Sequence, residues 1–176
     1  MKKLGLIFIL ISTFMFAKDA AVINAEADIA LKAFKTNHAS GYSLITENAK
    51  AYLIFPKVIK AGIGIGGEYG EGVLRTNNGV NMAYYSTAAA SIGFQLGAQT
   101  KSVIVAFLTE DALKNFMNAD GWKVGVDGSV TLIKIGATGA IDTSTLNKPI
   151  VGFIFGEKGL MYNLTLEGSK FSKINR

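Results

Sequence analysis

Cysteine is absent from the 176-residue chain, and histidine occurs once, at position 38. Without a thiol there is no disulfide, no cysteine nucleophile and no lipid-modified cysteine, and a single histidine excludes the usual zinc ligand sets. The motifs H-E-x-x-H and G-x-S-x-G and the phosphate-binding P-loop are also missing. We therefore expect a protein without catalytic activity, bound metal or cofactor.

The charge balance is only mildly basic, with 18 Lys and Arg against 13 Asp and Glu and a net charge of +5. Without residues 1–17, which hold two of the lysines and no acid, the net charge falls to +3. This excess is small, and no Arg-rich patch accompanies it, so the sequence argues against nucleic acid as a partner.

The first seventeen residues have the pattern of an export signal. Lys2 and Lys3 precede an apolar run over residues 4–16, and the small Ala17 suits a cleavage position. The run is shorter than the ~20 residues of a membrane-spanning helix, which disfavours the alternative of a retained anchor. We expect an exported, periplasmic protein, with peripheral association with the outer membrane as a further expectation.

Residues 18–48 are predicted to be helical. Over residues 19–37 apolar side chains recur every three or four positions, a pattern typical of an amphipathic helix, and a second short helix is expected over residues 40–48. The apolar positions are Val22, Ile23, Ala27, Ile29, Ala30, Ala33 and Phe34. Asp28 and Lys32, one turn apart, add support to the first helix.

Residues 49–176 have the texture of an antiparallel sheet and form one unit with the helical segment. Turn signals stand at Asn78-Gly79, Asp127-Gly128 and residues 157–159, each between segments typical of strands. The segment SVIVAFL, residues 102–108, predicts a strand buried on both faces, and Thr109 precedes a predicted helix over ALKNFM. The other strands are expected near residues 61–67, 70–76, 80–87, 91–98, 122–126, 129–138, 149–156 and 160–166.

A glycine-rich stretch, KVIKAGIGIGGEYGEGVLR, contains the G-x-G-x-x-G pattern of dinucleotide sites at Gly62, Gly64 and Gly67. Such a site needs a helix directly after the glycines and an acidic residue about 20 positions further on. Two more glycines and a hairpin turn follow instead, and no acidic residue lies between Glu71 and Glu110. We interpret these glycines as positions of close backbone approach in a strongly curved sheet.

From about residue 49 to residue 174 the chain resembles the SYLF domain family, known as a lipid-binding module and, in yeast, as an actin-binding domain. The matching segments are AYLIFPKVIKAGIGIGGEYGEGVL (51–74), SIGFQLGAQTKSVIVAFLTEDALKNF (91–116), GWKVGVDGSV (121–130) and KPIVGFIFGEKGLMYNLTLEGSKFSKI (148–174). The resemblance implies an α+β single domain, in which a strongly curved, antiparallel, barrel-like sheet packs with a few helices.

The resemblance further implies binding of anionic phospholipid or lipopolysaccharide head groups. The residues that fit are a basic rim around the glycines, formed by Lys57, Lys60 and Arg75, and the helix residues Lys32, Lys35 and Phe34. Two plainer interpretations stay open, namely a helix whose apolar face packs on the sheet and lysines that are simply solvated. Glu68 and Glu71 are close enough in sequence for an acid–base pair, although a solvated hairpin rim is the favoured interpretation.

Three functions from different classes follow. The first is a non-enzymatic lipid-binding protein of the bacterial cell envelope, with an anionic membrane as partner and an envelope protein as a further candidate partner. Its alternative is a structural or carrier protein that holds a hydrophobic ligand. The second is an integral outer-membrane barrel, which the polar end SKFSKINR and the doubly apolar segment 102–108 disfavour. The third, an enzyme acting on envelope lipids, lacks a catalytic constellation.

Overall fold

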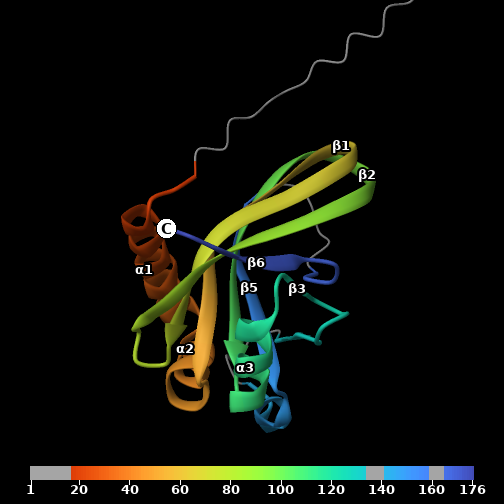
Figure 1. Cartoon of the computed structure of the whole chain (residues 1–176). Coiled ribbons are helices and arrows are strands. Elements are labelled where there is room, and N and C mark those ends of the chain that lie inside the picture. Colours follow the sequence, from red (N-terminus) through yellow and green to blue (C-terminus); the bar gives the residue numbers. More distant parts are fainter. Residues whose placement is uncertain (1–16, 134–140, 159–164) are drawn as a thin grey trace, which may run out of the picture.

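The protein folds as a mixed α+β single domain in which a curled half-barrel sheet packs against helices (Figure 1). The structure, a computed structural model, describes residues 17–133, 141–158 and 165–176. Its helices are α1 (Ala20–Asn37), α2 (Ala39–Ser43), which continues into a π-helical turn (Leu44–Asn48), α3 (Glu110–Asn118) and a 3₁₀ turn (Thr143–Asn147). Its strands are β1 (Ala51–Thr76), β2 (Asn81–Phe107), β3 (Trp122–Lys123), β4 (Thr131–Leu132), β5 (Ile150–Lys158) and β6 (Lys170–Ile174).

Two very long strands dominate the sheet. β1 and β2 pair antiparallel from Ala51↔Phe107 to Arg75↔Asn81, and the predicted turn at Asn78-Gly79 joins them, with Gly79 at a φ of 84°. The strands expected separately at 61–67 and 70–76 are therefore one strand, and those at 80–87, 91–98 and 102–108 are another. Figure 1 shows both strands bending at their far end, away from the helices.

Glycine lets β1 fold back over itself. A Cβ placed on Gly72 would lie 2.2 Å from the carbonyl oxygen of Ile54, and one on Gly62 would lie 2.3 Å from the Cα of Gly66. Real side chains never make such contacts, so the parts of β1 before and after its bend can approach this closely only where glycine leaves out the side chain. The prediction of close backbone approach in a strongly curved sheet is confirmed, and after Gly67 the chain continues as strand to Thr76 rather than as the helix of a nucleotide site.

The shorter strands extend the sheet along the other edge of β2. β5 pairs antiparallel with residues 100–107, and β6 pairs with residues 84–88 and also with β3. A turn does occupy residues 125–127, next to the turn signal at Asp127-Gly128, but its flanking strands form no hairpin, because β3 pairs with β6 while β4 runs parallel to β5. β6 arises from the polar end of the chain, which sequence inspection did not assign to a strand. Of the strands expected at 129–138 and 160–166, residues 134–138 and 160–164 lie outside the described residues.

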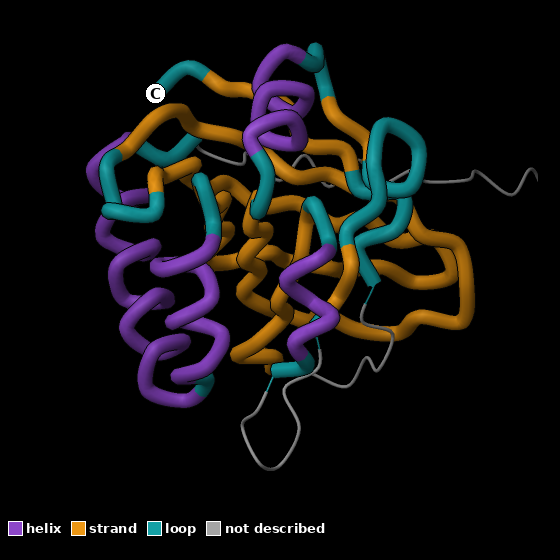
Figure 2. Tube along the Cα trace, turned by 90° about the horizontal axis from the view of Figure 1, so that it is seen from below, coloured by secondary structure: helices purple, strands orange, loops and turns teal. Residues whose placement is uncertain are grey.

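Hydrophobic cores lie on both faces of the sheet. On one face Phe34 and the rest of the inner side of α1 pack against Ile104 and Phe153, and Figure 2 shows this long helix alongside the curled strands. On the other face Phe116 of α3 packs against Phe107 and Trp122. Residues 103–107 contribute alternately to the two cores, which confirms that SVIVAFL is buried on both faces.

The predicted helix starts agree with the structure. α1 begins one residue after the expected position, α2 and the π-helical turn occupy the expected 40–48 segment, and the Thr109 side chain accepts a hydrogen bond from the backbone N–H of Ala112 at the start of α3. None of the described helices is both long and apolar enough to cross a membrane. Of the predicted export signal, only Ala17 belongs to the described residues.

Candidate functional site

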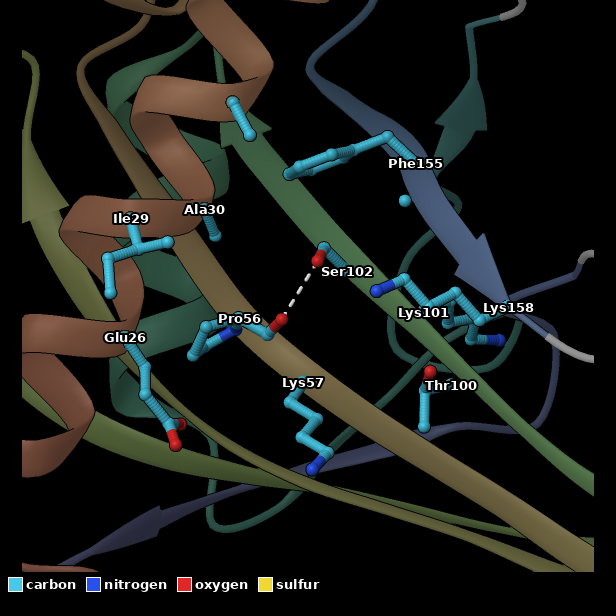
Figure 3. Close-up of a pocket in the computed structure, with 12 residues that line it drawn as sticks. Glu26, Ile29, Ala30, Pro56, Lys57, Thr100, Lys101, Ser102, Phe155 and Lys158 are labelled. Carbon is cyan, nitrogen blue, oxygen red and sulfur yellow. Dashed lines mark hydrogen bonds between the residues drawn. The ribbon is translucent and has the colours of Figure 1, made fainter.

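A groove of about 520 Å³ runs between α1 and the neighbouring strands β1, β2 and β5 (Figure 3). One wall is apolar and consists of Ile29, Ala30 and Ala33 of α1 together with Phe155 of β5. The opposite side carries the lysines Lys57, Lys101 and Lys158. The remaining lining residues are Glu26, Pro56, Thr100, Ser102 and Gly156. The arrangement sets an apolar surface beside basic groups.

Local structure explains how each wall forms. Ile29 and Ala30 lie three and four residues after Glu26, and Ala33 lies four and three residues after them, so all four share one side of α1. On the sheet side the ladder between β1 and β2 shifts register after Phe55, at Pro56, a residue that cannot donate a ladder hydrogen bond. The hydroxyl of Ser102 donates to the Pro56 carbonyl at 2.8 Å and ties this irregularity to β2.

Two of the three lysines have exposed side chains. Lys57 and Lys158 are exposed, whereas the ammonium of Lys101 is buried and lies 2.7 Å from the carboxylate of Glu68. Glu26, the acid in the lining, is already engaged by the ammonium of Lys18. The positive charge that the groove offers to a ligand therefore comes from Lys57 and Lys158.

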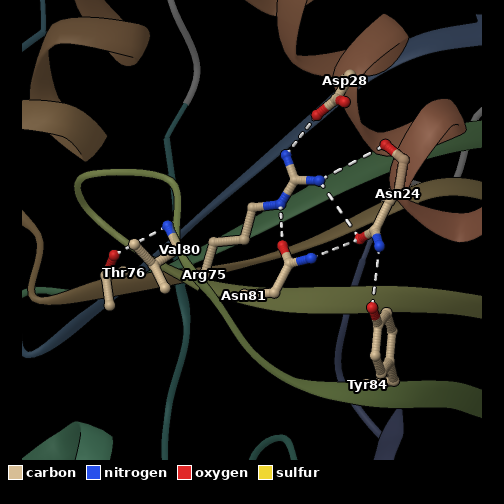
Figure 4. A network of polar contacts seen from close by, with 7 residues as sticks. All are labelled: Asn24, Asp28, Arg75, Thr76, Val80, Asn81 and Tyr84. Atoms are coloured by element: carbon tan, nitrogen blue, oxygen red, sulfur yellow. Dashed lines mark hydrogen bonds and ion pairs between the residues drawn. The ribbon is translucent and has the colours of Figure 1, made fainter. Parts of the chain in front are cut away.

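Arg75 is a structural residue rather than the rim cation that the sequence predicted (Figure 4). It is only 6% exposed, and its guanidinium reaches α1, where it pairs with Asp28 at 2.6 Å and contacts Asn24. Its Nε donates to the side-chain oxygen of Asn81 at 2.8 Å. The network joins the β1–β2 turn to α1. A buried guanidinium is stable only when acceptors such as these replace the water that it loses.

Lys60 is likewise placed inside rather than on a rim. It is 7% exposed and pairs across the ladder with Gln99, which is also buried. Of the predicted basic rim, only Lys57 is exposed, so Lys57, Lys60 and Arg75 do not gather on one surface. For Lys60 the physical reason is alternation, since neighbouring residues of a curled strand point to opposite faces and one of those faces is enclosed. Arg75 is instead covered by α1, whose Asp28 it binds.

The predicted helix residues divide in the same way. Lys32 and Lys35 are exposed, and the ammonium of Lys35 lies 5.0 Å from the centre of the Tyr42 ring. Phe34 is fully buried against Phe153 and Phe155, with ring centroids 5.1 and 4.9 Å away. A lipid contact through Phe34 would therefore require α1 to leave the sheet.

The apolar residues of α1 do not share one side as the sequence predicted. Ile23 and Phe34 are buried, whereas Val22 and Ile29 are 45% and 71% exposed. His38 is half-buried beside Phe34. Whether the exposed helix residues contact lipid stays a prediction.

Glu68 and Glu71 do not form an acid–base pair, because each carboxylate has its own partners. Glu68 binds Lys101, while Glu71 accepts hydrogen bonds from Arg176, from the Tyr69 hydroxyl at 2.9 Å and from the Lys18 backbone N–H at 3.2 Å. Burial by itself raises the pKa of Glu71, but these donors outweigh it and the pKa lies below its usual value. Burial, followed by the hydrogen bond to Glu71, raises the pKa of Tyr69.

Sequence inspection missed Lys158 and Phe155 as groove residues. Lys158 belongs to a segment predicted as a turn, and Phe155 belongs to a predicted strand, so no sequence motif indicated that either residue lines a site. The pairing of Lys158 with Thr100 on β2 brings it to the groove opened beside Lys57. Only this long-range pairing could have identified the two lysines as neighbours of one site.

Comparison with known families matches residues 88–175 to the Ysc84 family, described as "Las17-binding protein actin regulator". The match spans half of the chain. It includes Phe155 and Lys158, while Ile29 and Lys57 precede it. A search of curated proteins finds no match.

Proposed function

Since the chain belongs to the Ysc84 family of SYLF domains, whose members commonly bind lipids or actin-related partners, we propose that it is a lipid-binding protein of the bacterial cell envelope without catalytic activity. Its ligand is an anionic phospholipid or a lipopolysaccharide. Its place is the periplasm, with peripheral association with the outer membrane.

The groove beside α1 is the observation that carries this proposal. A lipid has an apolar chain and, in the anionic classes, a phosphate, and the groove offers one partner to each. Exposed Ile29 and the small accessible part of the otherwise buried Phe155 face the chain, while Lys57 and Lys158 supply donors and positive charge to the phosphate. Each lysine near an anionic surface contributes about 1 kcal/mol, so the association is reversible and weakens with salt.

Vesicle co-sedimentation tests the proposal directly. Wild-type protein is incubated with phosphatidylglycerol-containing vesicles and with pure phosphatidylcholine vesicles, at about 0.1 M and about 0.5 M salt. We expect binding to the anionic vesicles that weakens at the higher salt concentration. Equal absence of binding to both vesicle types would contradict the proposal.

A charge-reversal pair assigns the binding to the groove. The double variant K57E/K158E should bind anionic vesicles more weakly by at least about tenfold. The matched control K50E/K114E changes the net charge equally, at two exposed lysines that do not line the groove. If both double variants lose the same affinity, net charge rather than the groove accounts for binding.

A carrier of a hydrophobic ligand is the second candidate, because the apolar wall of the groove suits a free acyl chain. Native mass spectrometry of protein purified from its own envelope separates the two functions. A lipid that stays bound through purification at one copy per chain supports a carrier, whereas loss of all lipid together with vesicle binding supports a peripheral membrane protein.

A further inference from the structure

The far end of the curled sheet carries the most exposed large apolar side chains among the described residues. Ile63 is 80% and Ile65 is 74% exposed, and both lie where β1 bends back on itself. This end, which we call the apex (residues 61–67 of β1), points away from α1 and α3 (Figure 1). Exposure of this degree is unfavourable in water, which indicates that the two isoleucines of the apex contact something other than water.

The apex is strand rather than loop. Gly62 approaches the backbone of Gly66 too closely to admit a side chain, and β2 pairs with the apex at Gly62↔Gly97 and Gly66↔Ser91, with a register shift between Ile63 and Ile65. Because side chains alternate along a strand, the isoleucines belong to an outward row that is exposed throughout. The row comprises Lys57, Ile59, Ala61, Ile63, Ile65 and Gly67. Its order is therefore a lysine followed by an apolar stretch.

Charge is excluded from the apex and concentrated around its base. No charged residue occurs at positions 61–67 or 76–100. On one side of the base stand exposed Lys57 and Lys158, the latter paired with Thr100. On the other side exposed Lys170 pairs with Ala88, beside Lys123. Asp127 is the acid beside this second pair, and its carboxylate accepts the backbone N–H of Lys123.

We propose that the apex inserts Ile63 and Ile65 into the boundary between head groups and acyl chains of an anionic bilayer. The lysines at its base then lie at the level of the phosphates. An apolar tip with lysines on two sides of its base is complementary to a membrane, in which an anionic layer covers an apolar one.

The inference rests on the proposed lipid-binding function and adds the element that enters the bilayer. The groove binds a head group and one chain, whereas the apex contacts the membrane as a surface. Lys57 belongs both to the groove and to the outward row of β1, so one orientation of the protein allows both contacts.

Replacement of the two isoleucines tests the apex. We expect I63S/I65S to bind phosphatidylglycerol vesicles about tenfold or more weakly than wild type and to lose mainly the binding that persists at about 0.5 M salt. The control V80S/L146S removes two apolar side chains that are 63% and 48% exposed and lie outside the apex, and it should stay within about twofold of wild type. Circular dichroism checks that each variant is folded.

The outcomes distinguish a failure of the apex inference from a failure of the proposed lipid-binding function. If wild type binds and I63S/I65S binds equally well, or the control loses as much affinity, the apex is not the inserting element and the lipid-binding function stands. If wild type binds no vesicle, the proposed function fails and the inference fails with it.

A single label gives a second measurement that does not depend on affinity. Because the chain has no cysteine, I63C carries the only thiol and takes one environment-sensitive fluorophore. On phosphatidylglycerol vesicles its emission should shift to the blue and be quenched by brominated acyl chains, while the same label at V80C should not respond. An unchanged spectrum of labelled I63C on protein that sediments with the vesicles would overturn the inference.

Discussion

Several charged residues of β1 stabilise the fold although their sequence context resembles a ligand site. Arg75 and Glu71 each bind groups that are distant in the sequence, namely α1 for Arg75 and both Lys18 and Arg176 for Glu71. Such buried charges are stable only with their partners, because desolvation without compensation is costly. Their contribution should therefore appear in stability rather than in binding.

Replacement of Arg75 tests this assignment. R75M removes the hydrogen bonds to Asn24 and Asn81 and the ion pair with Asp28, so the free energy of unfolding should fall by about 2–3 kcal/mol. K32M, at an exposed position of α1, should change it by less than about 0.5 kcal/mol. Urea unfolding measures both variants. A vesicle affinity that fell for folded R75M but not for K32M would restore Arg75 as a ligand contact.

Glu71 should make the stability depend on acid pH. Its pKa in the folded protein lies below its usual value of 4.5, so its stabilising contribution is complete above that value and is lost as the pH falls through the folded pKa. E71Q should therefore be less stable than wild type at about pH 7, by about 2 kcal/mol, and the difference should shrink toward about pH 3. Urea unfolding across this range measures it, and a constant difference would contradict the prediction.

At the scale of elements, the bend of β1 and the docking of α1 decide what the site looks like. The bend forms the apex, and α1 supplies one wall of the groove. Each depends on a small number of close contacts, so each can be disturbed separately.

The glycines of the G-x-G-x-x-G pattern should differ sharply in tolerance. G62A forces a Cβ to within 2.3 Å of the Gly66 Cα, and we expect a loss of about 3 kcal/mol or an opened bend. In G67A the new Cβ would lie 3.9 Å from the Ala89 carbonyl oxygen, an ordinary contact, so stability should change by less than about 1 kcal/mol. Thermal unfolding compares the two, and equal losses would show that the bend does not depend on close approach at Gly62.

The docking of α1 depends on Phe34. F34A removes a fully buried ring from between Phe153 and Phe155 and should cost about 3–4 kcal/mol of stability. I29A shortens a side chain that is 71% exposed and should cost less than about 1 kcal/mol, while it weakens the apolar wall of the groove. If F34A were as stable as I29A, α1 would not be held as the structure shows.

At the scale of the whole molecule, the two hydrophobic cores share one sheet. Val105 and Phe107 face one core, and Ile104 and Ala106 face the other, so β2 belongs to both. Neither core can lose its packing without exposing the strand that supports the other. We infer that the domain unfolds as one unit.

Two probes can check this cooperativity. The fluorescence of Trp122, the single tryptophan, reports the core beside α3, and far-UV circular dichroism at the helical minimum reports mainly α1. Urea midpoints from the two probes should coincide. An earlier midpoint by circular dichroism would show that α1 and its core separate before the rest.

Local patterns were sufficient to predict the helices and the curvature of the sheet. The helix over 19–37, the Thr109 cap and the Asn78-Gly79 turn depend on interactions within a few residues, and each appears in the structure, although the apolar residues of α1 do not share one side. The SYLF resemblance, confirmed by the family match, was likewise carried by contiguous segments. The merging of predicted strands into β1 and β2 went unnoticed because glycines inside a bent strand give the same signal as turns between strands.

Tertiary structure alone decided which charged residues are exposed beside the groove. In the sequence Lys57, Lys60 and Arg75 are equivalent cations, but the curl encloses one face of β1, and α1 covers part of the other, which leaves only Lys57 exposed. Lys158 reaches the groove through a strand pairing across more than fifty residues, and β6 forms because β2 offers a free edge to a polar segment. Burial and pairing partners depend on the whole chain, and no local pattern records them.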